Sequence, residues 1–152
     1  MQNLVTNYYL ISAMGAWLLA QFLKIFTGFF KEQKFTLKAL FFGTGGMPSS
    51  HTATVAALAT ACAIGEGFDS AIFAISVVLA IIVMIDATGV RRETGIQARV
   101  LNELTEVIEK MGSDLSNDEK LKEFVGHTPI QVFVGAVLGI IIALIYCLVI
   151  IK

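Results

Sequence analysis

The two histidines of this chain are the residues best suited to chemistry at neutral pH, because imidazole can act as a nucleophile, a general acid or a general base. His51 ends the run Pro48-Ser49-Ser50-His51, and His127 lies in Gly126-His127-Thr128-Pro129. Small polar residues are common just before the first turn of a helix, and proline is common at its first position. The unpaired N–H groups of such a turn favour a bound anion. Both histidines are therefore predicted to lie at anion-binding helix starts.

Cationic side chains occur near the same boundaries. Lys24 and Lys31 follow the first apolar stretch, and Arg91 with Arg92 follow the third, close to Asp86. A guanidinium group matches phosphate oxygens in a bidentate manner. Glycines at 43, 45 and 46 would let the backbone turn tightly beside a phosphate. The combination predicts a phosphate pocket that also includes the hydroxyls of Ser49 and Ser50.

The elements that must position these residues are membrane helices. The chain has 152 residues, of which 56% are hydrophobic and 15% charged, with a mean hydropathy of +0.77, outside the range of a soluble domain. Residues 1–23, 39–65, 70–85 and 128–151 contain no Asp, Glu, Lys or Arg. Each is close to the roughly 20 residues that span a bilayer. The third stretch is shorter than a span and reaches that length only with residues 86–90. The second stretch is longer than a span and matches that length only if its helix begins near Pro48.

Helices are the expected form of these spans, because an unclosed strand would leave backbone groups unpaired in lipid. We predict an all-α integral membrane bundle of about four transmembrane helices, formed by a single domain over residues 1–152. Between the third and fourth spans, apolar residues recur at helical spacing over 96–111, which predicts an interfacial amphipathic helix. Ser116 and Glu119 predict a capping box for a short helix that ends before Gly126.

The distribution of basic residues predicts the orientation in the membrane. Ten of the eleven Lys and Arg residues lie on one side of the four spans. They are Lys24, Lys31, Lys34, Lys38, Arg91, Arg92, Arg99, Lys110, Lys120 and Lys122. The positive-inside rule places that side, with the histidines, in the cytoplasm. We therefore expect a multi-pass protein of the cell membrane with both termini extracytoplasmic.

The cysteines and the spacing of possible metal ligands predict neither a disulfide nor a metal site. Cys62 and Cys147 lie inside predicted spans, where a thiol packs as a small apolar group. The two histidines are far apart in the sequence, and Cys, Asp and Glu do not cluster at the spacing of metal ligands, so we expect no metal site. We also expect no cofactor and no nucleic-acid partner. Gly135 and Gly139 are four residues apart, a spacing that lets another helix backbone approach closely. A homodimer is therefore one expected assembly.

These residues resemble the type 2 phosphatidic acid phosphatases (PAP2), most closely their divergent branch of small membrane proteins. The family has three motifs: a Lys followed seven residues later by Arg-Pro, a Pro-Ser-Gly-His, and a Ser-Arg followed by a His with an acidic residue four later. The matching positions are Lys24 with Lys31, Pro48-Ser49-Ser50-His51, and Gly126-His127 continuing to Gly135 and Gly139. Asp86-Ala87-Thr88-Gly89-Val90-Arg91-Arg92, with Gln97 and Asn102, is similar to the divergent branch specifically.

The chain has Glu32 where the first motif has Pro and Ser50 where the second has Gly, and two further departures bear on the mechanism. Leu121 stands where the third motif has its Arg, so Arg91 or Arg92 would have to supply the guanidinium group. Gln131 stands where the family has the acidic residue that orients the nucleophilic His, and Asp86 is the carboxylate that can replace it.

The resemblance implies a phosphatase that needs no metal. His127 would attack phosphorus to give a phosphohistidine, His51 would protonate the leaving oxygen, and water would release phosphate. The implied substrate is a membrane phospholipid such as phosphatidylglycerophosphate or phosphatidic acid, or a polyprenyl phosphate. Two other functions are compatible with the residues: a phospholipid-binding or scaffolding protein that keeps the fold without catalysis, and a small transporter. No inverted repeat supports the transporter.

Overall fold

A computed structural model of the chain describes residues 6–27, 47–112, 121, 123 and 125–150. These residues form helices and no strand, which confirms the all-α prediction for the described part. The helices are α1 (Tyr8–Phe26), α3 (Ser50–Glu66), α4 (Ala71–Thr88), α5 (Val90–Lys110) and α6 (Pro129–Ile150). The bounds of α1, α4 and α6 agree with the predicted spans to within a few residues, except that α1 begins later. Helix α3 begins beside Pro48, as its span required.

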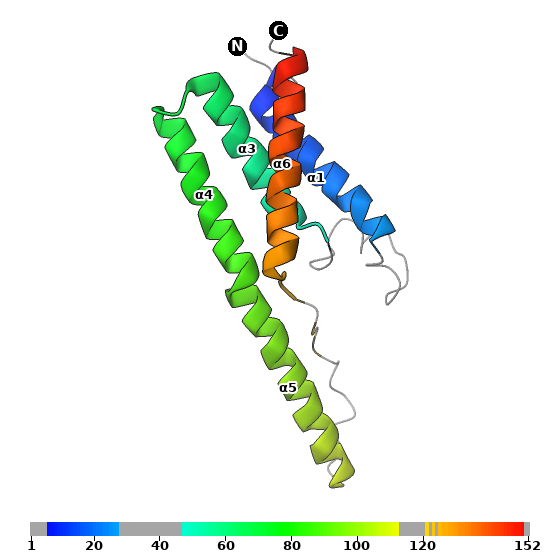
Figure 1. Cartoon of the computed structure of the whole chain (residues 1–152). Helices are drawn as coiled ribbons and strands as arrows, with labels where there is room; N and C mark the ends of the chain where they lie inside the picture. The colour runs from blue at the N-terminus through cyan, green and yellow to red at the C-terminus, as the bar shows by residue number, and fades with distance from the viewer. Residues whose placement is uncertain (1–5, 28–46, 113–120, 122, 124, 151–152) are drawn as a thin grey trace.

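The bundle consists of α1, α3, α4 and α6, with α3 in contact with the other three. The start of α1, the end of α6 and the turn between α3 and α4 lie at one end (Figure 1). The opposite end therefore collects the end of α1, the end of α4 and the starts of α3 and α6. These are the four places at which the sequence carries its histidines and most of its predicted site residues.

Three segments in the described part of the chain are long and apolar enough to cross a membrane: Tyr8–Phe26, Ala71–Lys110 and Pro129–Val149. Helix α3 has 17 residues and is more enclosed than the other bundle helices, because it contacts α1, α4 and α6. Large apolar side chains point outward from α1, α4 and α6, among them Leu18, Ile82 and Phe133. The chain is therefore a multi-pass membrane protein whose outer surface suits lipid.

Small residues form the interior of this bundle. Ala16, Ala20, Ala53, Ala57 and Ala143 are fully buried and form one cluster across α1, α3 and α6. In lipid, apolar side chains gain little by leaving the solvent, so helix association depends on close packing between small residues. The alanine interior lets the three helices approach one another closely.

Gly135 and Gly139 provide the closest approach, and their partner is α3 of the same chain. A Cβ at Gly135 would lie 2.5 Å from the Ser49 carbonyl oxygen, and one at Gly139 would collide with the Ala53 carbonyl oxygen. The prediction that these glycines admit another backbone is thus confirmed. They are enclosed within the chain, however, and are not available to a second copy; the homodimer stays a prediction that these glycines do not support.

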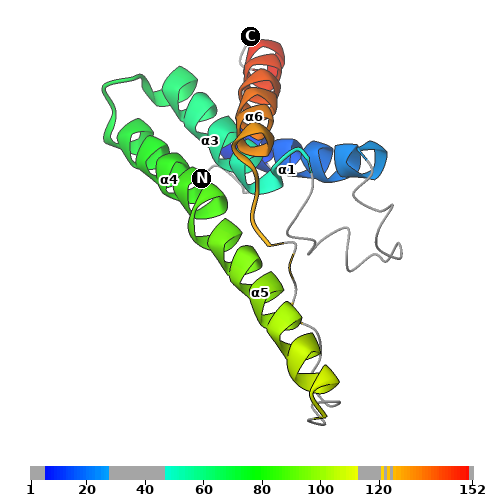
Figure 2. The same ribbon diagram turned by 60° about the horizontal axis from the view of Figure 1, so that its bottom comes forward.

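Helix α5 confirms the helix predicted over 96–111 and its amphipathic character, although it begins earlier, at Val90; its placement at the membrane interface stays a prediction. Gly89 separates it from α4, and both Figure 1 and Figure 2 show α5 continuing the line of α4 beyond the other helices. The combined segment has 40 residues, about 60 Å at the helical rise. A bilayer core is only about 30 Å thick, so α5 extends outside the hydrocarbon region. The capping box predicted at Ser116 and Glu119 lies outside the described residues.

A glycine substitution tests the α3–α6 contact. We expect Gly139→Ala to destabilise the protein by about 1 to 3 kcal/mol, the usual cost of overpacking, because the added methyl group meets the Ala53 carbonyl. Gly15→Ala is the matched control, since nothing lies within 4 Å of a Cβ there, and it should be neutral or stabilising. Thermal unfolding in detergent measures both variants. Equal stability of Gly139→Ala and wild type would contradict the close packing.

Candidate functional site

A pocket opens at the end of the bundle where four chain segments meet. It has a volume of about 80 Å³. One water needs about 10 to 15 Å³ measured in this way, so the pocket can hold a phosphate-sized group but not a whole lipid. Its lining residues are His51, Val83, Asp86, Ala87, Arg91 and His127. Four of the predicted site residues therefore share one pocket, although they come from distant parts of the sequence.

The break between α4 and α5 places His127. A helix leaves its last carbonyl groups without partners in the helix, and α4 ends beside Gly89. The Ala87 carbonyl in that last turn accepts a hydrogen bond of 2.9 Å from the His127 N–H. Gly126, at φ +89°, lets the chain approach this junction, because a Cβ there would collide with the Arg92 backbone. The backbone of His127 is thus fixed to α4.

The His127 side chain is buried, with 4% of its surface exposed. Its Nδ1 atom is also buried and makes no hydrogen bond within the described part of the chain. Burial lowers the pKa of His127 from 6.5 to about 4; the charge of Lys24 contributes to this decrease, and the Gln131 side chain opposes it. His127 is therefore neutral at pH 7, the form in which imidazole is a nucleophile.

Gln131 has a structural task at the start of α6. Its side-chain oxygen accepts a hydrogen bond of 2.9 Å from the Thr128 N–H, and the Thr128 hydroxyl accepts one of 3.4 Å from the Gln131 N–H. This reciprocal pair is a capping box, with Pro129 at the first helical position. The side-chain oxygen of Gln131, which stands at the position of the family's orienting acid, is therefore occupied by the helix cap, and Nδ1 of His127 makes no hydrogen bond within the described residues.

Three of the predicted phosphate ligands form internal contacts at the start of α3. The Ser49 hydroxyl caps α3, accepting hydrogen bonds from the N–H of Thr52 at 3.4 Å and its hydroxyl at 2.9 Å. Lys24 donates to the Ser50 hydroxyl at 3.2 Å, and only 3% of Lys24 is exposed. None of Lys24, Ser49 and Ser50 lines the pocket described above. The hydroxyls stabilise the helix start that holds His51 there.

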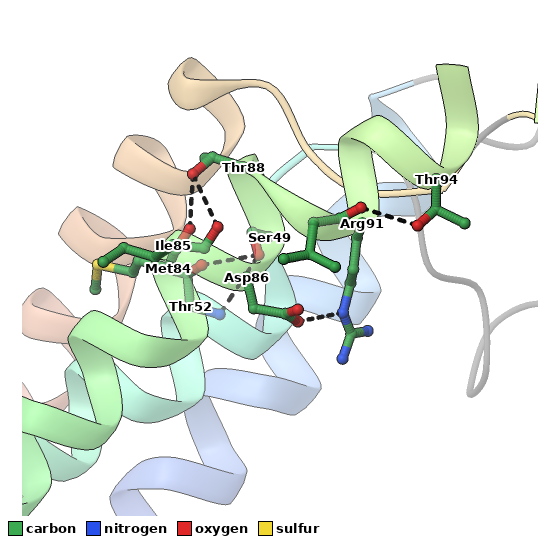
Figure 3. A network of polar contacts seen from close by, with 9 residues as sticks. Ser49, Thr52, Met84, Ile85, Asp86, Thr88, Arg91 and Thr94 are labelled. Atoms are coloured by element: carbon green, nitrogen blue, oxygen red, sulfur yellow. Dashed lines mark hydrogen bonds and ion pairs between the residues drawn. The ribbon is translucent and has the colours of Figure 1, made fainter. Parts of the chain in front are cut away.

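Arg91 and Asp86, which lie on either side of Gly89 in the sequence, form an ion pair (Figure 3). The Arg91 Nε atom donates to an Asp86 carboxylate oxygen at 2.5 Å. The terminal nitrogens of the guanidinium group lie on its far side in Figure 3. The sequence predicts that Asp86 orients His127; within the described residues the hydrogen-bond partner of its carboxylate is Arg91. The carboxylate thus fixes a cation at the pocket.

The remaining predicted site residues are Arg92, His51, Lys31 and the glycines at 43, 45 and 46. Arg92 is exposed and does not line the pocket. Lys31 and the glycines at 43, 45 and 46 lie outside the described residues. His51 lines the pocket but is exposed, so its ring can exchange protons with water. Within the described part of the chain, no three His, Cys, Asp or Glu residues are grouped to hold a metal ion.

Sequence reasoning missed the supports behind the site. It did not identify the Ala87 carbonyl as the anchor of His127. It also did not identify Gly95 as the place where the backbone of Glu123 and Val125, just before His127, contacts α5. Gly95 lies within a helical pattern, where a glycine costs stability and indicates a packing requirement. That signal was available, although the pattern does not say which segment needs the space.

Comparison with known proteins agrees with the motifs. A family model described as "Divergent PAP2 family" matches residues 5–142. The chain is 41% identical over 152 residues to the uncharacterized membrane protein YuiD of Bacillus subtilis (strain 168), covering 94% of this chain and 96% of that protein. No solved structure matches the chain.

The burial of His127 predicts a dependence of stability on pH. Between pH 6.5 and pH 4 the unfolded chain binds a proton at this residue that the folded chain does not. Stability should therefore decrease as the pH falls through this range, by up to about 3 kcal/mol at pH 4. Denaturant unfolding of wild type and His127→Asn at several pH values measures the effect. Identical pH dependence in the two proteins would show that His127 is not buried in its neutral form.

Proposed function

This chain belongs to the divergent PAP2 family, and on that premise we propose that it is a membrane-embedded phosphatase of lipid phosphates. The observation that carries the proposal is His127: a buried, neutral imidazole in a pocket that also contains His51 and Arg91. A nucleophile, a proton donor and a cation are the groups that phosphoryl transfer requires.

The proposed reaction has two steps. A ring nitrogen of His127 attacks phosphorus, forming a P–N bond while the bond from phosphorus to the lipid oxygen breaks, and His51 donates a proton to that leaving oxygen. Water then attacks the phosphohistidine, His51 removes a proton from it, and the P–N bond breaks to release phosphate and regenerate neutral His127. His51 suits proton exchange because it is the more exposed histidine.

Arg91 is the proposed ligand of the phosphate oxygens. Asp86 holds the Nε side of its guanidinium group, so the terminal nitrogens are available to the substrate. Lys24 contributes positive charge from the interior without lining the pocket. We assign Asp86 to the positioning of Arg91 in place of the orientation of His127.

The proposed substrate is a phosphomonoester or diphosphate on a membrane lipid. The pocket accepts little more than the phosphate group, and Val83 and Ala87 give it an apolar wall on the helix that crosses the membrane. A lipid whose phosphate is terminal fits this arrangement, as in phosphatidic acid, phosphatidylglycerophosphate or a polyprenyl diphosphate. We place the pocket at the cytoplasmic face because it lies at the helix ends where Lys24, Arg91 and Arg92 occur.

A second candidate function is phospholipid binding without catalysis. Two contacts favour it: Gln131 caps α6, and Asp86 pairs with Arg91. Gln131 carries no negative charge with which to stabilise an imidazolium, and the Asp86 carboxylate is paired with Arg91. A protein of this kind would keep the anion pocket and lose only turnover.

Phosphate release decides between these functions. We expect purified protein in detergent to release phosphate from at least one lipid of a phospholipid and polyprenyl phosphate panel, and His127→Ala to abolish both release and the radiolabelled phosphoenzyme. His51→Ala should slow release by roughly 10² to 10⁴, with recovery on an aryl phosphate whose leaving group needs no proton. Unfolding curves must show that the variants are folded. Equal release by wild type and His127→Ala from every lipid would contradict the phosphatase and favour the binding protein.

Orientation is tested by cysteine labelling in intact cells. In a Cys62→Ala, Cys147→Ala background, a membrane-impermeant maleimide should label Asn3→Cys directly and Lys34→Cys only after permeabilisation. The expected difference follows from the ten basic residues on one side of the spans. Strong labelling of Lys34→Cys in intact cells would move the pocket to the outer face.

A further inference from the structure

The segment that leads into His127 is attached to α5 by the amide of Asn102. The Asn102 Nδ2 atom donates to the Leu121 carbonyl at 2.9 Å, and its Oδ1 atom accepts from the Leu121 N–H at 3.0 Å. Nδ2 also donates to the Glu123 carboxylate at 2.8 Å. One side chain therefore satisfies both backbone groups of Leu121 and a side chain two residues further along.

Two more contacts hold the same segment against the same side of α5. A Cβ at Gly95 would lie 2.5 Å from the Glu123 carbonyl oxygen and 2.8 Å from that of Val125. Glu123 also lies 3.5 Å from the Arg99 guanidinium. Gly95 and Ala98 are the buried residues of α5, which shows that this face is covered while the rest of the helix is largely exposed.

These contacts matter for His127 because they hold the backbone that carries its ring. Nδ1 is unpaired in the described part of the chain, so the position of the ring depends on the backbone that carries it. That backbone is attached at Leu121 and Glu123 to Asn102, at Gly126 to the α4–α5 junction, and at His127 to the Ala87 carbonyl. The Asn102 contacts form the outermost of these attachments.

The interior of the bundle does not account for the Asn102 contacts. Helix α5 extends beyond the bundle, and its principal helical neighbour is α4. The alanine and glycine packing among α1, α3 and α6 involves no residue of α5. Loss of the Asn102 amide should therefore leave the bundle intact while releasing the segment before His127.

We infer that Asn102 is a positioning residue for His127, acting through the contacts of Leu121, Glu123, Val125 and Gly126. The inference rests on the proposed phosphatase function for its effect on turnover, but not for its effect on the position of His127. Helix α5 thereby serves as a rigid support for the pocket, and movement of α5 relative to α4 would displace the proposed nucleophile.

The test uses His127 as its own reporter. The chain has two histidines, so His51→Gln in protein without a histidine tag leaves one. The rate of His127 modification by diethyl pyrocarbonate, followed by mass spectrometry, then measures the accessibility of this ring. We expect slow modification in the His51→Gln background and a severalfold faster rate when Asn102→Ala is added. Thr105→Ala is the control, because its hydroxyl bonds the Leu101 carbonyl of its own helix, and it should leave the rate unchanged.

A compensating pair separates positioning from general damage. Asn102→Asp keeps the acceptor for the Leu121 N–H but loses both donated bonds and faces the Glu123 carboxylate. Adding Glu123→Gln replaces that carboxylate by an amide that can donate, so the double variant should recover much of the protection lost in Asn102→Asp. In proteins with His51 intact, Asn102→Ala should lower kcat by about 10- to 100-fold with little change in KM, as expected for misplacement of a reacting group.

The two proposals fail in different ways. If wild type releases no phosphate but Asn102→Ala still exposes His127, the phosphatase proposal fails and the positioning of His127 stands. If Asn102→Ala folds and leaves both the modification rate and kcat unchanged, the positioning inference is wrong whatever the enzyme does. If Asn102→Ala does not fold, the double variant decides: a modification rate no slower than that of Asn102→Asp alone overturns the inference.

Discussion

The close approach of α6 to α3 is the constraint on which the site depends. Gly135 and Gly139 bring the α6 backbone against the carbonyl groups of Ser49 and Ala53, and the Ser49 N–H donates to the Gln131 carbonyl at 3.1 Å. Each helix therefore begins beside the other at the same end of the bundle. Because one histidine lies at each beginning, the packing that holds two membrane helices together also brings His51 and His127 to one pocket. Larger residues at the glycines would separate the helices and the histidines together.

The α4–α5 junction contributes the other half of the pocket. Gly89 ends α4, and the carbonyl of Ala87 in its last turn accepts the His127 N–H. The same interruption lets Asp86 and Arg91 form an ion pair between the last turn of one helix and the first turn of the next. A continuous helix would use the Ala87 carbonyl internally. A helix break thus supplies both the anchor of the histidine and the placement of the cation.

The charges near the pocket lie in very different surroundings. Lys24 is almost completely buried, and within the described residues its ammonium group has one partner, the Ser50 hydroxyl; Arg91 is partly exposed and paired with a carboxylate. An unpaired charge removed from water is costly, so the interior near Lys24 and His127 favours the arrival of an anion. That preference supports a pocket for phosphate, and it is shared by a phosphatase and a non-catalytic binding protein.

The sequence by itself determined the membrane class, the helical form and the identity of the residues at one end of the bundle. Uninterrupted apolar stretches have few alternatives in lipid, and the ends of those stretches are visible as Pro48, Thr128-Pro129 and the arginines after residue 90. Motif spacing also identified the family correctly, because the two histidines and the small residues around them are local features of the chain.

Only the tertiary structure decided which of those residues share the pocket and what the others do. Ser49, Ser50 and Gln131 have the same hydrogen-bonding groups whether they meet a ligand or cap a helix, and the choice depends on neighbours that are distant in the sequence. Likewise, Asp86 pairs with Arg91, and Asn102 binds Leu121 from 19 residues away. Spacing along one chain cannot specify such contacts, because they depend on how closely separate helices approach and where a helix ends.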